Sequence, residues 1–416
     1  MARRSSGVRK KVTADTLVSL GAERLAEILA DVAETRVDLK RRLRMELAAQ
    51  EGPGPLAAEI DKRLAAFETS RGRIGWRQRP AFIRDLDALR DLIVARLAPL
   101  DLAAATQRLW RFMGTSTQSA GRYRERNSEL ESLYARAAGD LGGLLARSPS
   151  GPAAETLVEA LAGDVAGWKA WLPALLAQAP KPLAIDALEM MAERRGAGPG
   201  WITLIRHLAD AAGDIGAFRG SYSDDALKSA PVAAELAQRY LAAGQVEEAG
   251  QALRAAAPKA TGRGKPSVDF AWETLWIEYL ERSGRGDEAQ AVRWESYERT
   301  LSAERARAFI ARLDDFDDVE AETRAFDIAR AARDLRQGLA FLMDWPALPE
   351  AARMIEQRSG EVQVDPTTAE LWAAKLRRRF PKAAWILLRA AASAAFRRRD
   401  FKTSDRLSEE AATIGV

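Results

Sequence analysis

The chain has 416 residues, of which 47% are hydrophobic, so it is long enough for two or three ordinary domains or one elongated array. The 63 basic and 59 acidic residues leave a net charge of only +4, which does not indicate a uniformly basic surface. Cysteine is absent, which excludes disulfides, thiolate metal sites and cysteine nucleophiles. Because neither an apolar run long enough to span a membrane nor the apolar core of a secretory signal is found, we expect a cytoplasmic protein.

The N-terminal part of the chain is predicted to be a disordered basic arm followed by helices. Residues 1–12 are rich in Arg and Lys and show no apolar periodicity. From there on, apolar residues recur at intervals of three and four, which predicts helices. These helices cover about residues 14–33, 36–50, 55–68, 79–98 and 101–113. We therefore expect an N-terminal helical region over 13–113, followed by a break at the polar run 114–126.

The next region, residues 127–230, is predicted to consist of helical repeats. The same periodicity places helices near 127–146, 152–163, 166–178, 182–195 and 200–212. Their connections contain Pro and Gly, as tight helix-to-helix turns require.

The clearest pattern is a helix-turn-helix unit that occurs twice between Pro231 and Ser302. In each copy an apolar stripe ends at a glycine, Gly244 or Gly284, where we expect the left-handed conformation that often follows a helix. Acidic residues then open the second helix of each pair, at the end where the helix dipole favours negative charge. They are Glu247, Glu248, Asp287 and Glu288. Two such short helices cannot bury their apolar faces alone, so neighbouring pairs should stack.

The C-terminal part continues this layout less regularly. Helices are predicted near 303–312, 318–343, 347–358 and 367–378, and a last hairpin spans about 382–413. In that hairpin Arg399 and Asp400 stand where the earlier pairs have a glycine turn. The prediction is an all-α chain, a tetratricopeptide-like helical-hairpin solenoid over 231–416 with a possibly separable N-terminal helical domain.

Four segments resemble a family of uncharacterised bacterial helical-repeat proteins, a domain of unknown function. They are residues 20–29, 74–94, 291–322 and 376–391. A similar C-terminal region resembles part of the bacterial SWIM zinc-finger proteins. This chain has no cysteine and so lacks their zinc motif, and a nucleic-acid function inferred through that motif does not transfer to it. The resemblance supports a helical fold, provides no established catalytic residues to carry over, and leaves the function open.

Two features suggest chemistry but have simpler structural interpretations. His207 is the only histidine, and Asp210 and Asp214 lie near it, yet no nucleophile motif accompanies it. We interpret His207 as a partly buried helix residue. The acidic run from Asp314 to Glu322 lacks the spacing of a calcium loop, so we interpret it as a solvated helix start with Phe316 and Val319 packing inward.

Two further features are interpreted in the same way. The segment 260–267 is glycine-rich and basic but has no phosphate-binding pattern, so we expect a flexible loop. Tryptophans at helical spacing, Trp168 with Trp171 and Trp272 with Trp276, are expected to fill helix interfaces. No metal or cofactor site is predicted.

Clusters of basic side chains are the main functional signal. Arginine pairs with carboxylate or phosphate and stacks on aromatic rings, so these clusters are candidate contacts to a partner or to a phosphate backbone. The candidates are Arg41, Arg42, Arg44, Arg73, Trp76, Arg77, Arg79, Arg377, Arg378, Arg379 and Arg398. The alternative is an ordinary solvated surface on which these arginines pair with nearby acids.

The sequence therefore predicts a non-catalytic cytoplasmic interaction scaffold that binds a protein or peptide partner on a helical-repeat surface. The alternative is a nucleic-acid-associated protein that contacts the phosphate backbone through the basic clusters. We expect neither enzymatic activity nor a cofactor.

Overall fold

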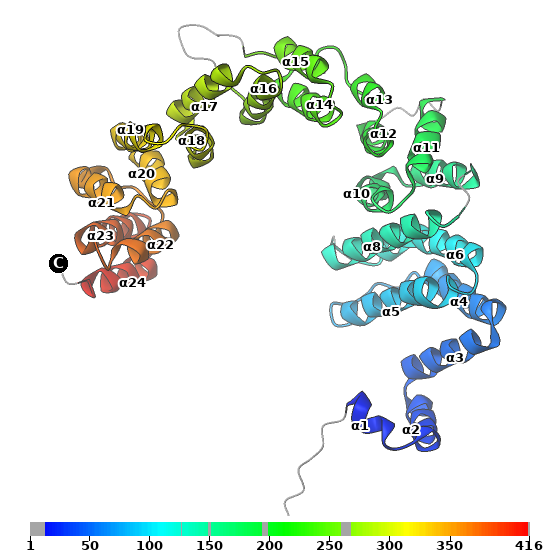
Figure 1. The fold of residues 1–416 in the computed structure, drawn as a ribbon. Helices are drawn as coiled ribbons and strands as arrows, with labels where there is room; N and C mark the ends of the chain where they lie inside the picture. The colour runs from blue at the N-terminus through cyan, green and yellow to red at the C-terminus, as the bar shows by residue number, and fades with distance from the viewer. Residues whose placement is uncertain (1–12, 126, 149–150, 194–198, 259–267, 415–416) are drawn as a thin grey trace, which may run out of the picture. The chain divides into compact units, whose positions relative to one another are not determined.

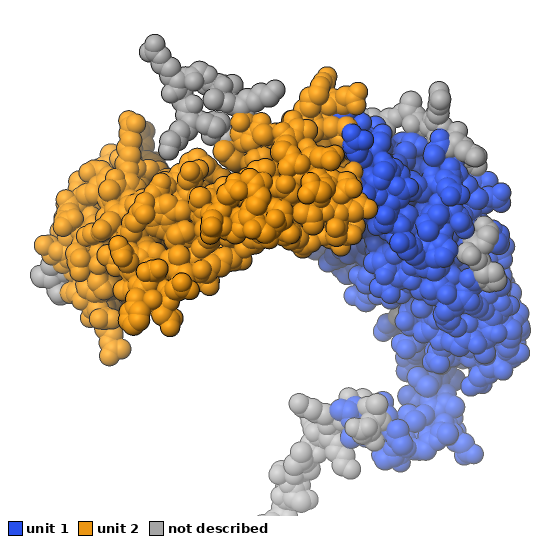
Figure 2. All heavy atoms as spheres, turned by 45° about the horizontal axis from the view of Figure 1, so that its top comes forward, with its two compact units in different colours: residues 1–223 blue, residues 224–416 orange. Residues whose placement is uncertain are grey.

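Helices are the only regular secondary structure in the part of the chain that the computed structural model describes, residues 13–125, 127–148, 151–193, 199–258 and 268–414. The all-α fold is thus confirmed. Contacts between residues divide the chain into two compact units, 1–223 and 224–416 (Figure 2). The finer domain division expected from the sequence stays a prediction. Among the described helices, none combines the length and the apolar character needed to cross a bilayer.

Unit 1 contains a row of helices, α4, α6, α8, α10 and α12, in which each helix contacts the next (Figure 1). Helices α9 and α11 pack on each other beside this row. The helices are α1 (Ala14–Val18), α2 (Ala22–Thr35), α3 (Val37–Glu51), α4 (Pro53–Thr69), α5 (Arg79–Asp91), η1 (Leu92–Leu97), α6 (Leu102–Gly114), α7 (Ser116–Gly121), α8 (Ser128–Leu145), α9 (Gly151–Gly163), α10 (Val165–Leu176), α11 (Lys181–Glu193), α12 (Pro199–Ala212) and α13 (Ile215–Gly220).

Unit 2 consists of antiparallel helix pairs that share two apolar cores. One core joins α14 to α17, and the other extends from α17 to the C-terminal helix. The elements are η2 (Ala226–Lys228), α14 (Ala230–Ala242), α15 (Val246–Ala255), α16 (Phe270–Arg282), α17 (Gly286–Thr300), α18 (Ala303–Ile310), α19 (Asp317–Ala331), α20 (Leu335–Asp344), α21 (Leu348–Gln357), η3 (Ser359–Glu361), α22 (Pro366–Leu376), α23 (Pro381–Arg397) and α24 (Phe401–Ala412). This arrangement is compatible with a helical solenoid, and the tetratricopeptide-like assignment stays a prediction.

The turns of the repeated hairpins have the expected geometry. Gly244 and Gly284 take the left-handed conformation, with φ of 76° and 77°. Arg399 occupies the equivalent position in the last hairpin and also has positive φ, 64°. In all three turns the next N–H donates to the carbonyl five residues before it, at 2.8 Å after both glycines and 3.0 Å after Arg399. The acidic residues predicted to open α15 and α17 lie in the first turns of those helices.

Two long helices predicted from periodicity are each interrupted. The stretch 14–33 forms α1 and α2, because Gly21 between them has a φ of 80° and cannot continue a helix. The stretch 318–343 forms α19 and α20, because the carboxylate of Asp334 accepts from the N–H groups of Arg336 and Gln337 and starts a new helix.

The polar run 114–126, expected to be a break, contains the short helix α7 packed inside unit 1. Its Ser119 and the preceding Thr115 are both 1% exposed. Their hydroxyls hydrogen-bond the hydroxyl of Tyr134 in α8, at 3.1 and 2.8 Å. Because the polar atoms satisfy one another, the segment is buried in spite of its polar sequence.

Candidate functional site

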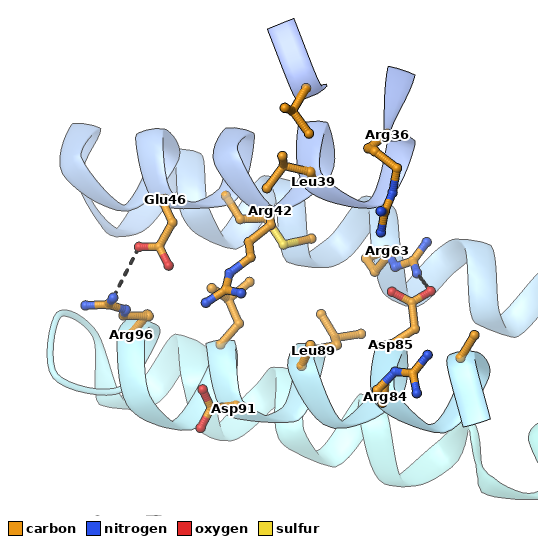
Figure 3. A pocket seen from close by; sticks show the side chains of 15 residues that line it. Arg36, Leu39, Arg42, Glu46, Arg63, Arg84, Asp85, Leu89, Asp91 and Arg96 are labelled. Atoms are coloured by element: carbon orange, nitrogen blue, oxygen red, sulfur yellow. Dashed lines mark hydrogen bonds and ion pairs between the residues drawn. The ribbon is translucent and has the colours of Figure 1, made fainter. Parts of the chain in front are cut away.

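An open groove of about 690 Å³ lies in unit 1 between α3 on one side and α5 with η1 on the other (Figure 3). Eight of its fifteen lining residues are charged and the others are apolar, so its surface is amphipathic. We call it the arginine groove, and its lining residues are Val32, Arg36, Leu39, Arg42, Met45, Glu46, Arg63, Ala81, Arg84, Asp85, Ala88, Leu89, Asp91, Leu92 and Arg96.

Two helical stripes build the walls of the groove. Residues three or four apart are neighbours on a helix surface, so a repeated spacing of three or four gives a strip of neighbouring side chains that winds around the helix. On α3 and its N-cap the strip has intervals of three and consists of Arg36, Leu39, Arg42 and Met45. On α5 and η1 it has intervals of four and consists of Arg84, Ala88, Leu92 and Arg96.

The C-terminal end of the second wall is a π-helix, η1. Its wider turn is seen in the hydrogen bond from the N–H of Ala98 to the carbonyl of Ile93, five residues earlier, at 3.0 Å. Ile93 and Leu97 are fully buried, while Leu92 and Arg96 line the groove. Single π turns inside α-helices are rare and occur often at functional sites. The sequence predicted a helix here but gave no signal for the π turn.

The charges of the groove are partly paired. Arg63 of α4 forms an ion pair with Asp85, and Arg96 Nη2 lies 3.3 Å from Glu46 Oε2 across the groove (Figure 3). Arg42 and Arg84 form no ion pair with any side chain that the structure describes. Five arginines against three carboxylates leave the lining positive, so it attracts negatively charged groups.

The first predicted cluster, residues 41–44, is divided by the geometry of α3. Arg42 lines the groove. Arg44 is exposed but lies two residues further along the helix, which places it on a different face. The side chain of Arg41 lies outside what the structure describes. The sequence analysis missed Arg84 and Arg96. A regular α-helix would turn residues twelve apart about 120° from each other, and the π turn η1, which periodicity did not predict, changes that spacing.

The second cluster lies on the loop 70–78 that connects α4 to α5. The N–H of Ile74 donates to the carbonyl of Arg122 at 3.1 Å, and Arg122 Nε donates to the carbonyl of Gly72 at 2.7 Å. The loop is therefore held against the end of α7. It exposes Arg73 and Trp76, whose indole is 71% exposed, and the guanidinium of Arg77 lies 4.9 Å from the centre of that ring.

Arg79, at the start of α5, differs from the other residues of this cluster because it is partly buried. Its guanidinium lies 5.5 Å from the ring centre of Tyr123. Arg79 Nε and the Tyr123 hydroxyl are both buried without a hydrogen-bond partner among the described residues. Burial raises the pKa of Tyr123, against the opposing charges of Arg79 and Arg122. We interpret Arg79 as a packing residue more than a surface contact.

The C-terminal candidates lie in unit 2, at opposite ends of α23. Arg377, Arg378 and Arg379 are exposed and follow α22 directly. Arg398 is exposed at the C-cap of α23. Because α23 has 17 residues, these two groups are about 25 Å apart. They do not form one continuous patch.

His207 is half-buried on α12. Burial lowers its pKa below 6.5, with the charge of Lys169 acting in the same direction and that of Asp210 in the opposite one. The imidazole is therefore neutral near pH 7. Among the described residues, no group of three or more Asp, Glu or His side chains is arranged to hold a metal ion.

The acidic run does form a helix start, with Asp317, Asp318 and Glu320 in the first turn of α19. The prediction that Phe316 and Val319 pack inward is wrong, since they are 86% and 61% exposed. Phe316 precedes the helix with a φ of 81°. Val319 is six residues before the buried Ala325, so the two side chains are about 120° apart around the helix and Val319 lies outside the packed face.

The paired tryptophans fill helix interfaces, as predicted. Trp168 and Trp171 are nearly buried and contact each other edge to face, with ring centres 5.9 Å apart. Trp272 is also buried, and its indole stacks on that of Trp276 at 5.6 Å.

A buried ionic network in unit 2 was not predicted from the sequence. The carboxylate of Glu273 in α16 accepts hydrogen bonds from Ser296 and from Arg299, the latter at 2.6 Å. Arg305 of α18 donates to Ser296 at 3.2 Å, and burial lowers its pKa against the opposing charge of Glu273. Glu273 interrupts an otherwise apolar run, which was the available signal. The network joins α16, α17 and α18, so we interpret it as structural.

Comparison with known proteins gives a family but no characterised relative. No curated protein and no solved structure matches the chain. One family matches it in two stretches, residues 8–198 and residues 192–406, which together cover nearly all of it. The chain therefore belongs to the DUF6880 family, a family of unknown function.

Proposed function

We propose that this protein is a non-catalytic interaction scaffold that binds a protein or peptide partner on its helical surface. The observation that supports this most is the arginine groove, in which apolar side chains lie beside Arg42 and Arg84, two arginines that form no ion pair with a described side chain. Apolar contacts contribute affinity, and charges at the rim select the partner and accelerate its association. Stacked helical repeats commonly use their extended surfaces in this way.

The experiment is affinity capture from native lysate, with and without nuclease treatment. We expect a protein that stays bound after nuclease treatment and elutes in a fixed ratio to the scaffold. Recovery of nucleic acid alone, or of no protein in a fixed ratio, would contradict the proposal.

The second candidate function is association with nucleic acid. It is favoured by the exposed indole of Trp76, which has Arg77 on one face and Arg73 nearby in the same loop. An exposed ring stacks on bases, and arginine neutralises phosphate. Binding to single-stranded and duplex DNA, titrated with salt, tests this candidate. Binding that is insensitive to salt, or unchanged in Trp76→Ala, would argue against it.

The proposal includes a cytoplasmic location, which the absence of cysteine supports, because reducing compartments do not favour disulfides. A bacterial origin and a relation to SWIM zinc-finger proteins also stay proposals, based on segments 291–322 and 376–391. Because the chain has no cysteine, we propose no zinc site.

A further inference from the structure

The arginine groove has an apolar floor between its charged rims. Leu89 and Leu92 of the second wall are nearly buried, and Leu39 and Met45 of α3 are partly exposed opposite them. A partner that covered this floor would remove apolar surface from water at about 25 cal/mol per Å². The floor therefore favours an occupant with a row of apolar side chains.

The apolar surface continues out of the groove along α2. Val32 lines the groove and is 41% exposed, and Ile28 and Leu29 lie on the same helix face, 37% and 40% exposed. Exposed apolar patches that are rimmed by charge mark interaction sites.

The sign of the rim charge specifies the partner. Arg42 and Arg84 lie on opposite walls and form no ion pair with a described residue. The pair between Arg96 and Glu46 is solvent-exposed and so contributes little, which allows Arg96 to exchange its partner. Acidic side chains on both flanks of an apolar row would meet these arginines. The basic arm of this chain, residues 1–12, has the same sign as the groove and is unsuited to it.

The secondary structure of the occupant follows from its surroundings. All regular elements described in unit 1 are helices, so the groove offers no strand edge to which an extended peptide could add. The backbone of a docked segment must then satisfy its own hydrogen bonds, as a helix does. From Arg36 to Glu46 the wall rises by ten residues, which is about 15 Å along the helix axis. This length matches about three helical turns of a partner.

A nucleic acid fits the groove less well than a peptide. Three carboxylates, Glu46, Asp85 and Asp91, lie among the arginines and would repel a continuous phosphate backbone. The described lining contains no aromatic ring on which a base could stack.

We propose that the arginine groove binds a short amphipathic helix of a protein partner, with apolar residues on one face and acidic residues flanking them. This inference rests on the proposed scaffold function and specifies its partner. The apolar row covers Leu39 and Met45, and the acidic flanks pair with Arg42 and Arg84.

The test is selection of a displayed library of random helical peptides of about 14 residues on the full-length protein, followed by fluorescence anisotropy with the enriched peptides. We expect enriched peptides to be acidic, with apolar residues at intervals of three and four. Arg42→Glu and Arg84→Glu should each weaken their binding about tenfold. Ala88→Trp, at an exposed position of the groove, should block it sterically without a change of charge.

Arg44→Glu is the matched control, because it makes the same charge change on an exposed residue of α3 that does not line the groove. Its binding should equal that of the wild type, and circular dichroism should show that all variants are folded. Enrichment of basic peptides, failure to enrich any peptide, or equal losses in Arg42→Glu and Arg44→Glu would overturn the inference. Tighter binding of an oligonucleotide that depends on Arg42 would replace it with a nucleic-acid site.

The selection is independent of the lysate capture described above. A protein partner that binds Arg42→Glu and Ala88→Trp as well as the wild type would support the scaffold function and exclude the arginine groove as its binding site. Peptides that bind the groove, without any protein captured from lysate, would support the groove as a peptide-binding site and contradict the proposed scaffold function.

Discussion

The close packing of α8 on α10 depends on Gly142, which makes it a direct test of the fold. Gly142 lies in α8 against α10, where a Cβ atom would be 2.2 Å from the carbonyl oxygen of Leu175 and 3.2 Å from the backbone N of Ala179. Since both are backbone atoms, no side-chain rotation relieves the overlap. We therefore expect Gly142→Ala to force α8 and α10 apart.

The expected magnitude combines two opposing effects. Overpacking of a tight interior costs about 1–3 kcal/mol. Alanine is favoured over glycine inside a helix by about 1 kcal/mol. Because the overlap involves backbone, the packing cost should lie at the upper end of its range, giving a net destabilisation of about 1–2 kcal/mol for Gly142→Ala.

The adjacent residue is a matched control. A Cβ atom on Gly143, in the same helix, would meet no atom within 4 Å. Gly143→Ala should therefore stabilise the protein by up to about 1 kcal/mol. The assay is urea unfolding followed by circular dichroism, with hydrogen exchange to locate the change in α8 and α10. Equal effects of the two substitutions, or stabilisation by Gly142→Ala, would refute the close approach of these helices.

Three further predictions concern the last hairpin, the histidine and an ion-paired glutamate. Arg399→Gly should stabilise unit 2 by up to about 1 kcal/mol in urea unfolding, because glycine adopts the φ of 64° without a side-chain clash. A loss of stability would contradict this account of the turn. The NMR signal of His207 should titrate below pH 6.5, because burial lowers its pKa. Protonation of His207 on acidification should then destabilise the folded state. A measured pKa at or above 6.5 would contradict the effect of burial. Although burial alone would raise the pKa of Glu281, hydrogen bonds and ion pairs with Arg293 and Arg312 hold it below 4.5. Its stabilising contribution is complete above pH 4.5 and is lost as the pH falls through the lowered value, so Glu281→Gln should flatten the acid loss of stability measured by thermal unfolding.

Local features of the fold were predictable because their causes are local. The turns at Gly244 and Gly284, and the acidic helix starts that follow them, depend on backbone conformation and on the helix dipole within a few residues. The same reasoning placed Arg399 and Asp400 at the last turn, and the structure shows that Arg399 is the residue with positive φ. The apolar periodicity gave most helices for the same reason.

Predictions failed where a distant contact decides the outcome. The segment around Ser119 is polar in sequence, yet it is buried because Tyr134 supplies hydrogen-bond partners from another helix. Phe316 and Val319 are apolar, yet they are exposed, because the helices in the described part of the chain leave the first turn of α19 largely uncovered. Burial depends on which helices meet, and periodicity within one helix does not report that.

The candidate groove likewise combines features that the sequence predicts with features that depend on contacts between helices. The sequence by itself determined most of the helices and, where they are regular, which residues neighbour one another on their surfaces, because an α-helix fixes the spacing of its own residues. Only the tertiary structure decided that Arg42 of α3 and Arg84 of α5 line opposite walls of one groove, while Arg44 does not line it. The physical reason is that the packing of one helix on another is set by side chains far apart in the chain, which also determine which charges meet a partner.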